Sequence, residues 1–332
     1  MESEVNNIND TQAIDVILRP TKWDEYVGQE KVKEQLKIML EASKRRNEVC
    51  DHVLFYGQAG LGKTTLAHLV AREMGANLKI TSGPSLEKVG DIAAVLTNIE
   101  QGDVLFIDEA HRLNRMNEEV LYPAMEERKL NLIVGKGPTA RTIALDLPPF
   151  MLIAATTRAN LLSGPLRSRF GASFKLDYYN TENIQSIIER SAKILGMKID
   201  QKAVSIIAEA SRFTPRVANR LLKRVRDYGE VYNQGEAISE EIVKETFKML
   251  EIDTLGLEPY DRRLLEMIID KFNGGPVGVA TLAAALNDDR GNIEDVHEPF
   301  LMSIGLMIRT PSGRVATDHA YKHLGKISKK LN

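Results

Sequence analysis

The sequence has few of the features that mark secreted or membrane proteins. Its 332 residues include one cysteine, Cys50, so no disulfide can form within the chain, and a reducing compartment is expected. The longest apolar run, 150–155, is too short to span a bilayer, and no signal-peptide pattern is present. These absences predict a cytoplasmic protein that does not enter a membrane.

A strong net charge is also missing. Lys and Arg number 44 and Asp and Glu number 46, which gives a formal net charge of -2. A nucleic-acid binder with this balance must therefore use a local basic patch. Hydrophobic residues make up 43% and charged residues 27%, as in globular proteins, and the length exceeds one ordinary core. Two or three domains are expected.

Near-continuous apolar runs alternate with helical patterns in the first half of the chain. After the first run, helical spacing places Leu66, Ala67 and Val70 on one face. Buried strands separated by helices are typical of a parallel sheet that is covered on both faces. We predict an α/β domain over 21–179, with strands at 52–56, 104–107 and 151–155.

Two segments depart from this alternation. Residues 1–20 are polar and acidic, and they predict a loosely held arm whose end, with Ile17, Leu18 and Pro20, docks on something else. Strand-like runs on either side of a Gly/Pro turn at 135–138 predict a β-hairpin inserted at about 130–146.

The second half of the chain is helical and then changes character. Residues 180–254 predict a small helical domain in which Thr181 and Thr214 are the expected N-caps. A further domain over 257–332 shows three helical segments and then two strand-like ones, which is the winged-helix pattern. These segments are 261–272, 279–286, 292–304, 306–310 and 314–317.

The strand at 52–56 leads into a complete Walker A motif. The loop is Gly57-Gln58-Ala59-Gly60-Leu61-Gly62-Lys63-Thr64-Thr65. Its glycines let the backbone N–H groups face phosphates, and the following helix adds its positive end. Lys63 is expected to reach the β- and γ-phosphates of ATP, and the Thr64 hydroxyl to bind Mg²⁺. A chance glycine-rich turn is the competing interpretation, which the flanking strand and helix disfavour.

A second apolar strand ends in two carboxylates. Asp108 is expected to bind Mg²⁺, directly or through water, and Glu109 to orient and deprotonate the attacking water. Taken alone the pair could be a solvated strand end, but the phosphate loop upstream disfavours that. Because a motor hydrolyses ATP with water, whereas a kinase needs a bound acceptor, the pair favours an ATP hydrolase.

A third strand, at 151–155, ends in two hydroxyls. Thr157, or Thr156, is expected to hydrogen-bond the attacking water or the γ-phosphate. An ordinary helix or turn cap is the alternative for both residues.

Two arginine-containing segments suggest how the γ-phosphate is sensed. Arg167 and Arg169 stand in a loop-like segment, where one of them can stabilise a neighbour's transition state or the two can form a surface basic pair. Thr214 and Pro215 place Arg216 in the first turn of a helix. A cation is unfavourable there unless an anion such as a γ-phosphate is near.

These ordered motifs resemble those of the RuvB family, the AAA+ motors of Holliday-junction branch migration. The resemblance extends from Arg19-Pro20 to the carboxy-terminal hairpin. It implies an α/β P-loop NTPase of the AAA+ class with a small helical lid domain and a C-terminal winged-helix domain. Matching segments are Glu25-Tyr26-Val27-Gly28-Gln29, 60–67, Asp108-Glu109-Ala110-His111-Arg112-Leu113, 121–126, 146–150, 155–159, 214–222, 274–278 and 309–314.

The resemblance also implies roles for single residues. Arg169 is similar to the arginine finger that acts in trans, and Arg216 to the second sensor. The residues that it implies or the motifs predict at the nucleotide are Leu18, Arg19, Gly60, Gly62, Lys63, Thr64, Thr65, Glu126, Glu127, Arg128, Arg169, Tyr179 and Arg216. The implied DNA contacts are Arg290, Arg309 and Arg314.

What the resemblance implies about function is an ATP-driven, DNA-dependent motor of recombination and repair. Such a motor forms a homo-hexameric ring on double-stranded DNA at four-way junctions. The hairpin around 135–138 resembles one that docks a RuvA-type junction-binding partner, and a RuvC-type resolvase is expected in the same complex. The sequence departs from the family pattern at Gln58-Ala59, Glu127-Arg128 and Gly171-Ala172-Ser173.

The tail is basic, and two other functional classes stay open. From Gly305 onward six basic residues accompany one acid, Asp318, which suits contact with DNA phosphates or is simply a solvated tail. A clamp-loader-like assembly factor would lack a DNA-tracking winged helix. A P-loop regulator would bind DNA by sequence. The basic residues are Arg309, Arg314, Lys322, Lys326, Lys329 and Lys330.

Overall fold

The computed structural model describes residues 11–134, 141–233 and 235–327. They form two compact units that divide between Tyr178 and Tyr179. The tip of the expected hairpin at 135–138, which the resemblance assigns to a RuvA-type partner, and the tail residues Lys329 and Lys330 lie outside the described residues.

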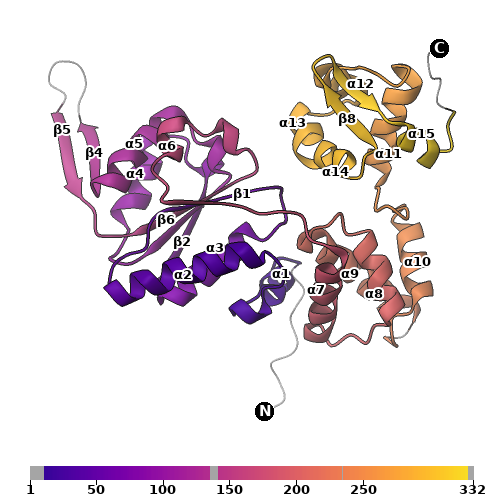
Figure 1. Cartoon of the computed structure of the whole chain (residues 1–332), viewed down its shortest axis with the longest axis horizontal. Coiled ribbons are helices and arrows are strands. Elements are labelled where there is room, and N and C mark those ends of the chain that lie inside the picture. Colours follow the sequence, from indigo (N-terminus) through magenta and orange to yellow (C-terminus); the bar gives the residue numbers. More distant parts are fainter. Residues whose placement is uncertain (1–10, 135–140, 234, 328–332) are drawn as a thin grey trace. The chain divides into compact units, whose positions relative to one another are not determined.

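The first unit is built on a five-stranded parallel sheet in the order β2-β3-β6-β1-β7. Figure 1 shows α2 and α3 on one face of this sheet and α4 and α5 on the other. The central strands are buried on both faces, which explains their near-continuous apolar sequences. The strands are β1 (Val53–Tyr56), β2 (Leu78–Ser82), β3 (Val104–Asp108), β6 (Met151–Thr156) and β7 (Ala172–Lys175).

The helices of this unit connect the strands and extend into the arm. The arm contains a helix, α1, and Leu18 at its end is 2% exposed, so the expected docking is confirmed for Leu18, whereas Ile17 is 43% exposed. The α-helices are α1 (Thr11–Leu18), α2 (Glu30–Arg46), α3 (Lys63–Met74), α4 (Val89–Thr97), α5 (Arg115–Glu126) and α6 (Gly164–Arg167). Short 3-10 turns are η1 (Trp23–Glu25), η2 (Gly83–Ser85), η3 (Ala110–Arg112) and η5 (Ala159–Leu161).

A separate antiparallel pair lies where the sequence indicates an inserted hairpin. β4 (Lys129–Val134) pairs with β5 (Arg141–Asp146), and Leu130 lies opposite Leu145. Leu130 is fully buried, whereas every residue of β5 is exposed. The hairpin is therefore anchored through β4, and it projects from the rest of the first unit (Figure 1).

The second unit begins with the small helical domain. Thr214 caps α9 as predicted, because its Oγ1 accepts the Val217 N–H at 3.4 Å. The prediction for Thr181 is wrong: the Asn180 side chain accepts the Asn183 N–H at 2.8 Å, so the cap lies one residue earlier. The helices are α7 (Thr181–Ile194), α8 (Gln201–Glu209), α9 (Pro215–Tyr232) and α10 (Glu240–Met249).

The winged-helix domain completes the second unit. The predicted helix at 292–304 consists of three consecutive helical pieces, and α15 was not predicted. The predicted fold class is confirmed: a parallel α/β core is followed by a helical domain and a winged helix. The elements are α11 (Pro259–Glu266), the π-helix η6 (Met267–Lys271), α12 (Val279–Leu286), α13 (Arg290–Asn292), the π-helix η7 (Ile293–His297), α14 (Glu298–Ser303), β8 (Met307–Thr310), β9 (Gly313–Ala316) and α15 (Asp318–His323). None of the described helices has the length and apolar character needed to cross a membrane.

Candidate functional site

Three parallel strands end at the same edge of the sheet. Tyr56 of β1 pairs with Thr156 of β6, and Ile107 of β3 pairs with Ala154 of the same strand. The phosphate loop follows β1, the acidic pair follows Ile107, and the predicted hydroxyls end β6. The structure thus brings these three predicted sets together at the carboxyl edge, where open α/β sheets bind ligands.

The side chain of Lys63 binds the backbone of the phosphate loop. Lys63, the first residue of α3, is 8% exposed, and its Nζ donates to the carbonyls of Gly57 and Gln58 at 2.7 Å each. Gly57 has φ of 143°, and a Cβ there would lie 2.5 Å from the Leu176 carbonyl oxygen, so only glycine fits. The N-cap of α3 is Gly62, which has no side chain to occupy the first N–H groups. The start of α3 can therefore receive an anion.

The acidic pair lies at the end of β3. Asp108 is partly exposed, and its Oδ1 accepts the Glu109 N–H at 2.9 Å. Glu109 is exposed and has φ of 47°, an uncommon conformation for a residue other than glycine. Its Oε2 lies 3.5 Å from an Arg112 nitrogen. Backbone conformations of this kind cluster at active sites and ligand-binding sites.

The residues present fit a Mg²⁺ ion that binds together with a nucleoside triphosphate. Thr64 in the first turn of α3 and Asp108 offer one hydroxyl and one carboxylate, both hard oxygen ligands. Among the described residues no group of three or more His, Cys, Asp or Glu side chains could hold a metal ion by itself. Mg²⁺ commonly binds through one or two side chains, with phosphates and water completing its octahedron.

The two hydroxyls at the end of β6 have different surroundings. Thr156 is 1% exposed; its Oγ1 shares a hydrogen bond with His111 Nδ1 at 3.0 Å and accepts the Arg158 N–H at 3.0 Å. Thr157 is partly exposed and remains the candidate sensor. The sequence interpretation gave His111 no role. Its position three residues after Asp108 was the one sign in the sequence that it could lie near the site.

The predicted arginine finger lies beside the end of α5. Arg169 donates to Glu126 Oε2 at 3.0 Å and to the Pro165 carbonyl at 2.7 Å. A pocket of about 260 Å³ is lined by Arg128 and Arg169, and by residues before β1 such as His52. No phosphate-loop residue lines it. Arg169, Glu126 and Arg128 are therefore gathered at the amino edge of the sheet, apart from the carboxyl edge that carries the loop, while Glu127 next to them is exposed.

The residues predicted at the base end of the nucleotide divide between the two units. Leu18 is buried, and an Arg19 nitrogen donates to His68 Nε2 at 2.5 Å on α3. Burial and the Arg19 charge lower the pKa of His68, and burial lowers the pKa of Arg19. Tyr179 belongs to the second unit, where it is 5% exposed and its N–H donates to the Phe213 carbonyl at 3.0 Å.

Arg216 has the position that the Thr-Pro-Arg pattern predicts. It is exposed in the first turn of α9, where Thr214 is the N-cap and Pro215 the first helical residue. Within the described part of the chain it has no ion pair, so its charge meets the positive end of the helix without compensation.

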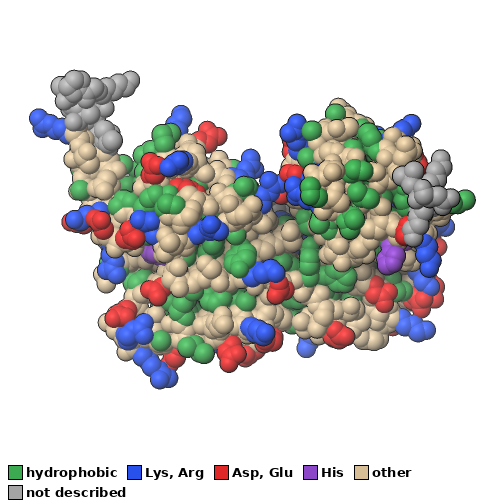
Figure 2. Space-filling model, turned by 45° about the horizontal axis from the view of Figure 1, so that its top comes forward, with side chains coloured by type: hydrophobic (Ala, Val, Ile, Leu, Met, Phe, Trp, Pro, Cys, Tyr) green, Lys and Arg blue, Asp and Glu red, His purple; other side chains and the backbone are tan. Residues whose placement is uncertain are grey.

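The three expected DNA contacts do not share one environment. Arg290 and Arg309 are exposed, and Arg309 lies 3.7 Å from Glu294. Arg314 is 6% exposed; it donates to Glu294 at 2.9 Å and also to Glu298. Burial opposes its charge, but the hydrogen bonds of these carboxylates outweigh burial and raise the pKa of Arg314. On the face in Figure 2, basic and acidic side chains are interspersed on both units.

Comparisons with known proteins agree along nearly the whole chain. Residues 18–176 match the family model described as the Holliday junction DNA helicase RuvB P-loop domain. Residues 179–253 match the RuvB AAA lid domain, and 254–325 the RuvB C-terminal winged helix domain. The chain is 55% identical, over 314 residues, to the Holliday junction branch migration complex subunit RuvB of Fusobacterium nucleatum, and the match covers 95% of this chain and 94% of that protein.

Solved structures are similar over the same extent. The Thermotoga maritima RuvB Holliday junction branch migration motor has a TM-score of 0.87 and 48% identity, covering 94% of this chain and 99% of that one. A point mutant of that protein has a TM-score of 0.87 and 47% identity, covering 95% and 99%. On these similarities in sequence, domain order and structure, the chain belongs to the RuvB family.

Proposed function

We propose that this protein hydrolyses ATP to move double-stranded DNA and thereby drives branch migration of Holliday junctions in recombination and repair. The observation that carries the proposal is the meeting of the phosphate loop, the Asp108–Glu109 pair and Thr157 at one sheet edge. The names of the relatives from Fusobacterium nucleatum and Thermotoga maritima support the choice of substrate.

Each residue at this edge has a defined task. The N–H groups of the loop and the Lys63 ammonium bind the β- and γ-phosphates. Thr64 and Asp108 would hold Mg²⁺, which when bound neutralises charge that develops on the phosphates. Glu109 orients the water and takes its proton, and Thr157 fixes the water or the γ-phosphate by a hydrogen bond.

Two arginines complete the site from elsewhere. Arg216 acts from the second unit of the same chain, where its uncompensated charge suits an anion. Arg169 acts on the neighbouring subunit's nucleotide, because it lies at the amino edge of the sheet rather than beside its own loop. Such sharing requires head-to-tail neighbours, as in a homo-hexameric ring.

The remaining assignments follow the family. Leu18, Arg19 and Tyr179 hold the base region, and Gly60, Gly62 and Thr65 line the phosphates. Arg290 and Arg309 of the winged helix contact the DNA backbone, for which exposed arginines suffice. The β4–β5 hairpin docks a RuvA-type partner, and a RuvC-type resolvase joins the complex in the cytoplasm.

The test is ATP-dependent migration of a synthetic four-way junction with homologous labelled arms, with and without a RuvA-type partner. We expect conversion to duplex products with ATP and none with a non-hydrolysable analogue or with Glu109→Gln protein. ATP hydrolysis without conversion would favour a clamp-loader-like role. Sequence-dependent DNA affinity with a weak salt dependence would favour a P-loop regulator.

A further inference from the structure

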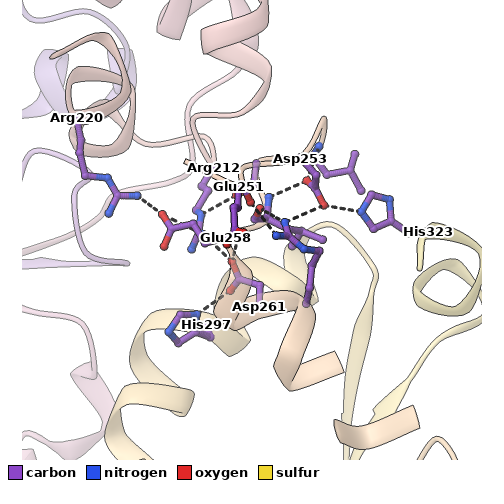
Figure 3. A network of polar contacts seen from close by, with 12 residues as sticks. Arg212, Arg220, Glu251, Asp253, Glu258, Asp261, His297 and His323 are labelled. Atoms are coloured by element: carbon purple, nitrogen blue, oxygen red, sulfur yellow. Dashed lines mark hydrogen bonds and ion pairs between the residues drawn. The ribbon is translucent and has the colours of Figure 1, made fainter. Parts of the chain in front are cut away.

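The helical and winged-helix domains are joined around one buried side chain, that of Arg212 (Figure 3). It is 8% exposed and donates to Asp261 Oδ2 at 2.6 Å and to the Gly256 carbonyl at 3.2 Å. Its guanidinium carbon lies 4.9 Å from the centre of the Phe300 ring. One arginine of the helical domain therefore contacts the linker, α11 and α14 of the winged-helix domain.

The acceptor of this arginine is itself fixed. Asp261 is fully buried; its Oδ1 shares a hydrogen bond with His297 Nδ1 at 2.7 Å, and its Oδ2 also accepts the Glu258 N–H at 2.9 Å. The linker backbone lies so close to the helical domain that a Cβ on Gly256 would be 2.4 Å from the Ala210 carbonyl oxygen. Both oxygens of Asp261 are hydrogen-bonded and the Arg212 head group is buried, so we expect this joint to be stiff.

The backbone at Arg212 is unusual as well. Arg212 and Phe213 have φ of 54° and 56°, two consecutive residues other than glycine in the left-handed region. Such strain persists only where the surroundings hold it, and here the Phe213 carbonyl accepts the Tyr179 N–H. The next residue, Thr214, caps α9, and Arg216 follows in its first turn. The turn at 211–214 therefore contains Arg212, which contacts the winged helix. It also adjoins Tyr179 and Arg216, the two residues assigned to the nucleotide.

We propose that Arg212 is a positioning residue of the motor, which transmits movement of the turn at 211–214 to the winged-helix domain. The inference rests on the proposed function, since it assumes that Arg216 and Tyr179 respond to the nucleotide. Movement of the start of α9 then carries α11 and α14 with it, because the Arg212 fork contacts both. Without the fork, hydrolysis proceeds but less of the movement reaches the DNA.

The test replaces Arg212 by methionine and measures junction steps per ATP hydrolysed. We expect hydrolysis without DNA to stay within about twofold of wild type and steps per ATP to fall by about tenfold or more. Arg262→Met is the matched control. Arg262 also joins the two domains, donating to the Glu251 and Leu257 carbonyls at 2.8 and 2.9 Å, but its partners lie outside the turn at 211–214. It should keep nearly the wild-type ratio.

A second variant is a control for misfolding, because Arg212→Met leaves the Asp261 charge buried and unpaired. The double variant Arg212→Met/Asp261→Asn removes that charge and keeps an oxygen for His297, and it should be uncoupled in the same way. Arg212→Lys, which restores charge without the fork, should recover coupling only in part.

The outcomes separate the two proposals. If wild-type protein hydrolyses ATP without moving the junction, the proposed function fails. If wild type moves the junction and the folded Arg212 variants step as efficiently as Arg262→Met, the inference about Arg212 is wrong. It is also wrong if the Arg212 variants lose unstimulated hydrolysis, because the residue would then act on the site and not on the coupling.

Discussion

The guanidinium of Arg169 lies over the ring of Tyr122, 4.5 Å from its centre, while one of its nitrogens donates to Glu126. Both partners belong to α5, so this helix holds the proposed arginine finger of its own subunit from two sides. The Arg169 Nε is buried without a hydrogen-bond partner among the described residues, so the fork is not saturated. A phosphate from a neighbouring subunit would have to compete with the Glu126 carboxylate and the Pro165 carbonyl for this arginine.

This relationship predicts the behaviour of Arg169→Ala protein. ATP hydrolysis should fall by about a thousandfold, because the developing charge loses its cation, while ATP binding stays near wild type. Mixing with Lys63→Ala subunits should restore some hydrolysis, measured as phosphate release against subunit ratio. The exposed neighbour Arg167→Ala is the control. Mixed assemblies with no recovery at any ratio would contradict action in trans.

Lys63 and Glu109 should separate binding from hydrolysis. Glu109→Gln protein should bind ATP normally and hydrolyse it about a hundredfold or more slowly, because the general base is lost. Lys63→Ala protein should lose binding as well, since Nζ is the charged group inside the loop. Fluorescent-nucleotide titration and phosphate release measure the two steps. Glu119→Gln, on the exposed face of α5, should change neither, and wild-type hydrolysis by Lys63→Ala would rule out the site.

Replacing Arg309 and replacing Arg314 in the winged helix should have different effects. Arg309→Ala should weaken DNA binding and lower the slope of log affinity against log salt by about one, with little effect on stability. Arg314→Ala should destabilise the protein by about 3–5 kcal/mol, because it leaves Glu298 buried without its cation. Salt-dependent DNA titration and urea unfolding measure the two effects. Equal loss of affinity at unchanged stability would show that Arg314 contacts DNA directly.

His52 should make stability depend on pH. Its Nδ1 accepts the Leu152 N–H at 2.8 Å and its Nε2 lies 3.1 Å from the Met125 carbonyl oxygen, so the ring is neutral. Burial lowers the pKa of His52 below its usual value of about 6.5. Below that value the unfolded chain binds the proton more readily than the folded one, so stability falls as the pH drops from about 7 toward the folded pKa.

Replacing this ring tests the pH dependence. His52→Gln protein should show a flatter profile of unfolding free energy between about pH 7 and pH 5, although its absolute stability is lower. His319→Gln, at an exposed position of α15, should keep the wild-type slope. Urea unfolding at half-unit pH intervals provides the measurement. A slope as steep as in wild type after His52→Gln would assign the pH dependence to other groups.

The sequence predicted what depends on local chemistry. Glycine spacing, a strand ending in two acids and a Thr-Pro pair each act over a few residues, so the loop, Asp108–Glu109 and the start of α9 were all placed correctly. The cap of α7 was missed because Asn180 and Thr181 both favour caps, and only the backbone decides between them. Burial of Arg314 and the joint at Arg212 depend on residues far along the chain, which no local pattern reveals.

The parallel sheet of the first unit has two chemically different ends. Asp51, His52 and Gly171 stand before β1 and β7 and line the pocket of Arg169, while Gly57 and Leu176 follow the same strands at the phosphate loop. Four residues at about 3.3 Å each separate the two ends by about 13 Å. If Arg169 acts in trans as proposed, each subunit of a head-to-tail assembly supplies halves of two different sites. A closed ring of these subunits leaves no half unmatched, whereas an open stack of any length has one fewer complete site than it has subunits.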